Sequence, residues 1–164
     1  MATLYRSVAP AVLGYMRGHG ASEPEDLTSE VFVGVMRALS RFRGDESDFR
    51  SWVFTIAHRR LVDERRSNAR ISDRHVGPHE PGVTGPSYDG PEDAILDRLA
   101  ARPVVRALED LTPDQRSVVL LRIIADLPVA DVACILGKRE GAVKTLQRRA
   151  LAALARAVEP AAVR

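Results

Sequence analysis

The stretch VACILGKREGAVKTLQRRA, residues 132–150, carries the pattern that decides the fold of the C-terminal half of the chain. If a first helix begins at Val129, the small side chain of Ala133 lies where two helices cross. Gly137 follows at a turn, where positive φ is easy, and Val143 anchors a second helix. This small–glycine–aliphatic spacing predicts a helix-turn-helix.

The second helix of this stretch concentrates positive charge. The 164-residue chain has a net charge of only +2, yet residues 138–156 contain six basic residues and one acidic residue, Glu140. Lysine and arginine at this density favour DNA binding, because they neutralise phosphates and read base edges. An ordinary amphipathic helical hairpin is the alternative that this stretch alone leaves open.

Composition limits the class of protein. Hydrophobic residues make up 45% of the sequence and aromatic residues only 5%, which favours helices packed through leucine, valine, alanine and isoleucine. The single cysteine, Cys134, excludes an internal disulfide and is expected to be a small buried side chain rather than a redox switch. No apolar run approaches the length of a membrane span and no export signal is evident, so we expect a cytoplasmic protein without membrane insertion.

A proline- and glycine-rich segment divides the chain. Residues 72–91, SDRHVGPHEPGVTGPSYDGP, hold four of the ten prolines and four of the eleven glycines, a density that breaks helices and central strands. We interpret residues 71–91 as a flexible linker between two small helical domains, 1–70 and 92–164, in an all-α fold. A long surface loop within one domain is the alternative, although structureless loops of this length are uncommon in compact domains.

The part before the linker is predicted to be entirely helical. Apolar residues recur at helical spacing over Leu4–Tyr15, and Gly18–Gly20 end that segment. Ser22–Glu25 has the pattern of a capping box and precedes a strongly helical stretch, Leu27–Phe42. The apolar surface of that stretch is wide enough to pack on two neighbours. A third helix is predicted over Phe49–Arg66.

Charge is unevenly distributed over this part. Residues 22–48 contain seven acidic and three basic residues, whereas residues 58–74 contain six arginines and three acidic residues. Such faces usually serve solubility, but arginines that follow an aromatic-bearing helix also suit a nucleic-acid strand. Trp52 alone is weak evidence, since a lone tryptophan on an inner face is more often part of the core.

The part after the linker has a well-specified helix start. In Thr112-Pro113-Asp114-Gln115, threonine suits the N-cap, proline the first helical position and glutamine the third. The apolar run Val118–Ile124 is then expected to form a buried helix that ends near Asp126.

Two segments resemble a known family. EDLTSEVFVGVMRALSRFRGDESDFRSWVFTIAHRRLVDERRS, residues 25–67, looks like region 2 of the sigma-70 factors, specifically the small extracytoplasmic-function (ECF) group. LEDLTPDQRSVVLLRIIADLPVADVACILGKREGAVKTLQRRALAAL, residues 108–154, looks like region 4 of the same group. The two motifs stand in the family's order on either side of a variable linker, which makes the resemblance highly specific.

The resemblance implies three functional surfaces. One docks on core RNA polymerase and comprises Asp26, Leu27, Ser29, Glu30 and Phe32. The second recognises and melts the −10 promoter element and comprises Arg43, Gly44, Asp45, Trp52, His58, Arg59, Arg60, Arg65 and Arg66. The third reads the −35 element in the major groove and comprises Arg139, Glu140, Lys144, Thr145, Arg148 and Arg149.

Three positions depart from the family pattern. The first helix of the helix-turn-helix usually begins with serine or threonine, but Pro128 stands there. Arg139 replaces the usual cap of the recognition helix, and Leu146 replaces a common arginine. A missing cap costs roughly 1 kcal/mol, and Leu146 removes one possible DNA contact, so the family's −35 preference is not carried over.

The resemblance also implies three binding partners and a protein without catalytic activity of its own. The expected partners are core RNA polymerase, promoter DNA and an anti-sigma protein; no cofactor, metal or catalytic residue is expected. His75 and His79 have a zinc-like interval without a second ligand pair, and Asp63 and Glu64 are poor candidates for paired acid–base catalysis because adjacent helical residues face different ways. The alternatives are a stand-alone helix-turn-helix regulator and an enzyme acting on nucleic acid.

Overall fold

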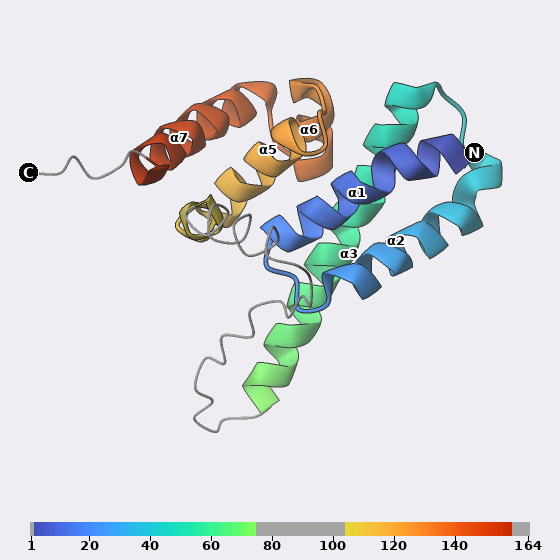
Figure 1. Ribbon diagram of the computed structural model, residues 1–164, viewed down its shortest axis with the longest axis horizontal. Helices are drawn as coiled ribbons and strands as arrows, with labels where there is room; N and C mark the ends of the chain where they lie inside the picture. The colour runs from blue at the N-terminus through green and yellow to red at the C-terminus, as the bar shows by residue number, and fades with distance from the viewer. Residues whose placement is uncertain (1, 75–103, 159–164) are drawn as a thin grey trace, which may run out of the picture.

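The computed structural model describes residues 2–74 and 104–158, with side chains over 5–70 and 104–157. Every regular element in these ranges is helical, which confirms the all-α prediction (Figure 1). No helix within them is long and apolar enough to cross a membrane. The elements are α1 (Ala2–Gly18), α2 (Pro24–Ala38), the short 3-10 helix η1 (Leu39–Arg41), α3 (Glu46–Arg74), α5 (Pro113–Ile123), α6 (Val129–Leu136) and α7 (Glu140–Val158).

The predicted linker coincides largely with the undescribed segment. Helix α3 continues to Arg74, past the predicted domain end at residue 70. The rest of the predicted linker, the predicted start of the second domain at residue 92, and His75 and His79 lie outside the described residues. Residues 104–109 are helical again and lead into α5.

The predicted cap and turn signals in the C-terminal part are confirmed, whereas the predicted buried helix Val118–Ile124 is buried only as far as Leu121, and Ile123 and Ile124 are 58% and 39% exposed. Thr112 is the N-cap of α5: its hydroxyl accepts the backbone N–H of Gln115 at 3.3 Å, and its own N–H donates to the Gln115 side chain at 3.1 Å. Pro128 is the N-cap of α6, where it offers no side-chain acceptor. Gly137 ends α6 in the left-handed conformation, with φ of 62°, as the turn requires.

Two local predictions are wrong. Ser22 does not cap α2; Pro24 takes the first helical position, so the N-cap moves to Glu23, and the Ser22 N–H instead donates to Glu64 at 3.3 Å. Cys134 is exposed rather than buried. The reason is its place on α6, one position beyond the buried pair Val132 and Ala133 and therefore on the opposite side of the helix.

Each half of the molecule has its own layer of packed helices. In the N-terminal unit, α1–α3, helix α2 lies against both α1 and α3, which confirms the expected packing on two neighbours. In the C-terminal unit, α5–α7, helix α7 crosses both α5 and α6. Val143 and Ala133 are buried there, as the helix-turn-helix spacing predicts.

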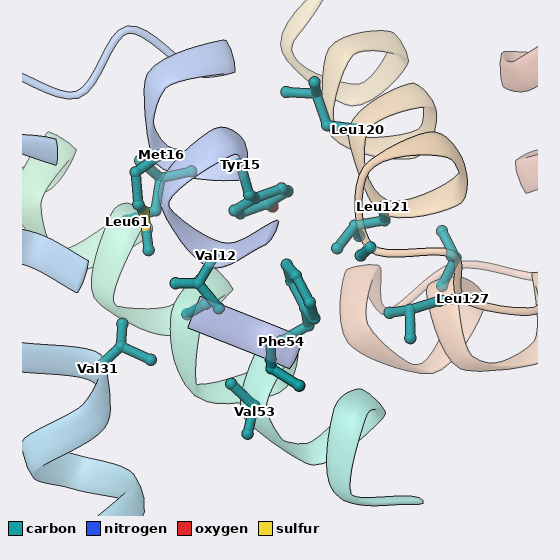
Figure 2. Packing of buried hydrophobic residues seen from close by; sticks show 14 of the residues in the cluster. Val12, Tyr15, Met16, Val31, Val53, Phe54, Leu61, Leu120, Leu121 and Leu127 are labelled. Carbon is teal, nitrogen blue, oxygen red and sulfur yellow. The ribbon is translucent and has the colours of Figure 1, made fainter. Parts of the chain in front are cut away.

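The two units share one hydrophobic core. Helix α1 packs on α5, and α3 packs on α6. Tyr15 and Phe54 from the N-terminal unit point toward Leu121 and Leu127 of the C-terminal unit, and all four side chains are fully buried (Figure 2). The described parts of the two predicted domains are therefore in direct contact.

A buried histidine lies at the end of α1. His19 is 3% exposed, and its Nδ1 and backbone carbonyl both lie within hydrogen-bond distance of the Arg65 guanidinium, at 3.0 and 3.1 Å. Its Nε2 is buried with no hydrogen-bond partner among the described residues. Burial, reinforced by the positive charges of Arg65 and Arg116, lowers the pKa of His19 to about 3.

This histidine is expected to make stability fall in mild acid. In the unfolded chain, His19 takes up a proton as the pH falls below its ordinary pKa of about 6.5. In the folded chain, the His19 imidazole stays neutral down to a pH of about 3. The free energy of unfolding is therefore unaffected by this group above pH 6.5. It decreases as the pH falls, by about 2 kcal/mol between pH 7 and pH 5. Urea unfolding at both pH values, on the parent chain and on His19→Asn, measures it. Equal pH dependence in the two chains would contradict the assignment.

Candidate nucleic-acid interface

One face of α2 combines acidic and apolar side chains. Asp26, Ser29 and Glu30 are exposed, as a docking surface requires. Val33 and Met36 lie on the same face, 49% and 69% exposed, and were not among the predicted residues. Their spacing from Ser29, four and seven residues, is the signal in the sequence that places them there. We call these five residues the α2 face.

The other two predicted docking residues lie beneath this face. Leu27 and Phe32 are each 8% exposed and belong to the core. Phe32 packs edge-on against Tyr5 of α1, with ring centroids 4.6 Å apart. These side chains hold α2 on α1 and α3, and so position the α2 face rather than form it.

A polar groove separates the α2 face from α3. Asp26, Glu30, Arg60 and Asp63 are among its lining residues. Arg60 lies 3.9 Å from the Glu30 carboxylate, and both side chains are well exposed. An exposed pair at this distance contributes little to stability. Arg60, predicted for promoter contact, thus lies next to a residue predicted for polymerase contact.

The predicted −10 loop has a defined conformation. Gly44 adopts a φ of 148°, and a Cβ there would lie 2.6 Å from the Cβ of Asp48. Asp45 and Asp48 exchange hydrogen bonds, each backbone N–H donating to the other's carboxylate at 2.9 to 3.0 Å. These bonds fix the start of α3, because they satisfy N–H groups that the first helical turn leaves unpaired. Arg43 is exposed, and its guanidinium donates to the carbonyls of Ser40 and Phe42.

An aromatic cluster supports this loop. Trp52 stacks on Phe42, with ring centroids 5.0 Å apart and planes 27° from parallel, and Phe49 packs against both rings. Trp52 is half-buried, which agrees with the expectation that an inner-face tryptophan is mainly core. One ring face is occupied by Phe42, so a base would stack on this cluster only at its outer side.

The basic residues of α3 differ in their contacts with the rest of the protein. Arg59, Arg60 and Arg66 are exposed and available to a nucleic-acid strand. His58 instead lies 2.9 Å, Nδ1 to Oη, from buried Tyr15, and Arg65 binds His19. Burial lowers the pKa of His58, which favours its neutral form. Four of the five basic α3 residues predicted for the −10 element are therefore exposed; one of these, Arg65, is also bound to His19, and His58 is held against Tyr15.

Helix α7, the second helix of the helix-turn-helix, presents most of its basic residues to solvent. Arg139, Glu140, Lys144, Arg148 and Arg149 are exposed, and Thr145 is half-buried with its hydroxyl donating to the Gly141 carbonyl at 3.0 Å. On the other side of the helix, Val143 and Ala150 are fully buried. Five of the six predicted −35 residues are thus exposed on α7 or just before it, and Thr145 is partly so.

Two contacts from α5 hold this helix in place. Lys138 Nζ lies 2.8 Å from the Asp114 carboxylate and ties the turn before α7 to the start of α5. Arg122 Nε donates to Gln147 of α7 at 3.3 Å, and its Nη1 donates to the Leu127 carbonyl before α6. Arg122 was not identified from the sequence, where an arginine in an apolar run gives no sign of its partners. Arg122 therefore links α7 to the segment that precedes α6.

Comparison with known families accounts for both units. Residues 4–71 match the model of Sigma-70 region 2, and residues 101–154 match the model of Sigma-70, region 4. The ECF RNA polymerase sigma factor ShbA of Streptomyces griseus is 31% identical over 92% of this chain and 83% of its own length. The chain belongs to the ECF group of sigma-70 factors.

Further relatives agree with this family. The ECF RNA polymerase sigma factor BldN of Streptomyces coelicolor is 36% identical over 94% of the chain, which spans 55% of BldN. Among solved structures, the sigma factor RpoE in complex with the anti-sigma factor NepR, from Bartonella quintana, superposes with a TM-score of 0.73. It covers 95% of this chain and 96% of RpoE at 20% identity, so it supports the fold alone. As a sigma factor, the chain is a transcription initiation factor of RNA polymerase.

Proposed function

We propose that this sigma factor docks on core RNA polymerase through the α2 face and holds promoter DNA at two places. The −10 element is recognised by residues 43–48 and the exposed arginines of α3, and the −35 element by α7. The observation that carries the proposal is the presence of an exposed acidic–apolar face on α2 in the same chain as an exposed basic recognition helix. In this proposal, residues 1–70 form the domain that docks on polymerase and recognises the −10 element. Residues 71–91 form the linker, and residues 92–164 form the domain that recognises the −35 element.

Within the promoter surfaces, roles follow from chemistry. Arg148 and Arg149 suit paired hydrogen bonds to guanine edges, whereas Lys144 suits phosphate. In the −10 region, Arg59 and Arg66 supply phosphate contacts to a separated strand. The loop around Gly44 receives a flipped base, which costs a few kcal/mol and least at easily unstacked steps.

This function requires no reaction at the chain's own residues. RNA polymerase supplies the chemistry, and the sigma factor supplies promoter choice and strand opening in the cytoplasm, where polymerase and chromosome are found. An enzyme acting on nucleic acid is the less favoured class. A sigma factor that cleaves or modifies promoter DNA without polymerase would contradict this part of the proposal.

We further propose that an anti-sigma protein restrains the chain. RpoE, whose fold this chain shares, was solved with the anti-sigma factor NepR. A protein that binds across the α2 face would block polymerase docking directly, because the acidic and apolar side chains there are the exposed ones.

Run-off transcription with purified core polymerase on genomic fragments tests the function. We expect transcripts only when chain and polymerase are both present, starting at a fixed distance from shared −10 and −35 sequences. The competing class, a stand-alone helix-turn-helix regulator, predicts the opposite: a footprint on DNA without polymerase and no transcript. The α2 face argues against that class, since a plain regulator has no use for it.

A further inference from the structure

Three basic side chains from different parts of the fold interact with one another. His19 follows the end of α1, Arg65 lies on α3, and Arg116 lies in the first turn of α5. The Arg65 guanidinium lies 3.0 Å from His19 Nδ1 and donates to the His19 carbonyl at 3.1 Å. Arg116 donates through Nη2 to the Glu109 carbonyl at 2.8 Å, and its charge acts on His19. We call His19, Arg65 and Arg116 the junction cluster.

The contacts of His19 determine which of its ring nitrogens carries the hydrogen. A guanidinium group only donates hydrogen bonds, so Nδ1 of His19 accepts from Arg65. The ring is neutral near neutral pH, because burial and the charges of Arg65 and Arg116 lower its pKa to about 3. A neutral imidazole that accepts at Nδ1 carries its hydrogen on Nε2. The Nε2 atom of His19 is therefore a buried hydrogen-bond donor.

Two buried N–H groups of the junction cluster have no acceptor among the described residues. They belong to Nε2 of His19 and to Nε of Arg116. Native proteins pair nearly all of their buried polar groups, and an exception requires a specific explanation such as a bound water or ion. His19 as a whole is 3% exposed, so bulk water does not supply the acceptor. Because both groups donate, a ligand that fits them must accept hydrogen bonds.

The charges around these two donors favour a negatively charged acceptor. Burial, reinforced by the positive charge of Arg65, lowers the pKa of Arg116, so the two guanidinium groups repel each other. Among the neighbouring carboxylates, Glu109 is exposed, and Asp114 is exposed and already pairs with Lys138 at 2.8 Å. A water molecule accepts hydrogen bonds but leaves the two charges uncompensated. An oxyanion does both, and its oxygens suit the fork of an arginine side chain.

We propose that the junction cluster binds a phosphate group, either as inorganic phosphate or as the terminal phosphate of a nucleotide. Its oxygens accept from His19 Nε2 and Arg116 Nε, and its charge lies against the guanidinium groups of Arg65 and Arg116. Because the site draws on three parts of the fold, binding favours the folded chain, and stability rises with the concentration of the anion. The site uses no residue of the α2 face or of α7. It gives Arg65, a predicted −10 contact, a different ligand.

Binding of inorganic phosphate to the full chain tests the site directly. The phosphorus resonance of phosphate is followed by NMR while the chain is titrated, with chloride keeping the ionic strength constant. We expect one saturable site per chain. Binding that does not saturate, as a general attraction to the basic surface of α7 would give, contradicts the proposal.

Substitutions within the cluster locate the site. Arg116→Gln removes the guanidinium from a partly exposed side chain, so phosphate should bind about tenfold or more weakly. His19→Phe keeps a ring against Tyr15 but lacks the Nε2 donor, and it should also bind weakly. Arg106→Gln is the matched control: Arg106 is an exposed arginine before α5 and outside the cluster, so this chain should keep the parent affinity. Equal affinity of the Arg116→Gln and Arg106→Gln chains overturns the assignment.

Thermal unfolding of the same chains measures the consequence for stability. Phosphate also stabilises proteins in general, because it is excluded from their surfaces, and this general effect is the same in every chain. At a phosphate concentration about 100-fold above the dissociation constant, the unfolding midpoint of the parent should rise by about 5 °C or more beyond that of Arg116→Gln. An equal rise in the two chains counts against the site.

Crystals soaked with tungstate show where the anion lies. An anomalous peak is expected within hydrogen-bond distance of His19 Nε2 and Arg116 Nε, and a water molecule there without an anion refutes the proposal. Titration with a nucleoside diphosphate distinguishes the two sources of the phosphate group. Tighter binding than inorganic phosphate supports the site with a nucleotide as its ligand, and equal binding supports it with the free anion.

Discussion

Replacing Met36 by aspartate is expected to weaken binding to core RNA polymerase by roughly 30-fold or more, the effect of losing an interface hot spot. Met36 is 69% exposed, which is unusual for a large apolar side chain, and it lies on a face that also bears Asp26 and Glu30. Its burial against polymerase would remove that apolar surface from water, and aspartate would place a charge in the contact instead. The measurement is equilibrium binding of labelled chain to purified core polymerase.

The control is an equally polar change at another exposed apolar residue. Leu151 on α7 is 42% exposed and lies in the other unit, so Leu151→Asp should retain the parent affinity. Surface substitutions of this kind usually change stability by about 0.5 kcal/mol or less, which thermal unfolding verifies for both variants. Equal affinity of Met36→Asp and Leu151→Asp would refute the α2 face as the docking site.

Replacing Arg148 and Arg149 by alanine is expected to abolish most −35-dependent transcription while leaving polymerase binding unchanged. A base-reading arginine is worth about 1–3 kcal/mol, so each loss lowers promoter use by about 5- to 150-fold. Arginine-to-lysine substitution keeps the charge but loses the paired hydrogen bonds. A guanine reader should therefore be impaired by lysine, and a phosphate contact should be largely rescued by it. Run-off yields on templates with an intact and a scrambled −35 element separate the two roles.

Arg156 supplies the matched control for this experiment. It is an exposed arginine on the same helix, in its last turn and away from the turn at Gly137. Arg156→Ala should leave the preference for the intact −35 element unchanged. If all three alanine variants lower transcription equally on intact and scrambled templates, α7 contributes only a general electrostatic attraction.

The local signals of the C-terminal unit were sufficient to predict the cap of α5, the turn at Gly137 and the burial of Ala133 and Val143, but not the exposure of Cys134. Thr112 and Gln115 satisfy each other's backbone N–H groups within one turn, and Gly137 is placed where only a left-handed residue closes the turn. Ala133 and Val143 are both buried in the core, as the spacing of the helix-turn-helix requires. Each cap and turn requirement is met by neighbours in sequence, so the pattern alone specifies it.

Features that depend on distant partners could not be predicted in this way. His58 and Arg65 look like further members of an arginine-rich helix face, yet they contact Tyr15 and His19, which lie more than 40 residues earlier in the sequence. Ser22 loses its capping role to the proline two residues on. The contact between Ser51 and Asp131 was equally impossible to predict, because the two residues are 80 positions apart and neither is unusual in its own helix.

The buried and exposed sides of α7 are under different constraints, and this difference has an evolutionary consequence. Its buried side, Val143 and Ala150, maintains the fold, while Lys144, Arg148 and Arg149 point into solvent. Substitutions on the outer side change stability little. With the proposed −35 contacts on this side, we expect promoter preference to diverge among duplicated copies of such a gene without compensating changes elsewhere in the protein. The same property makes the outer positions of α7 suitable for building sets of factors that each serve their own promoters in one cell.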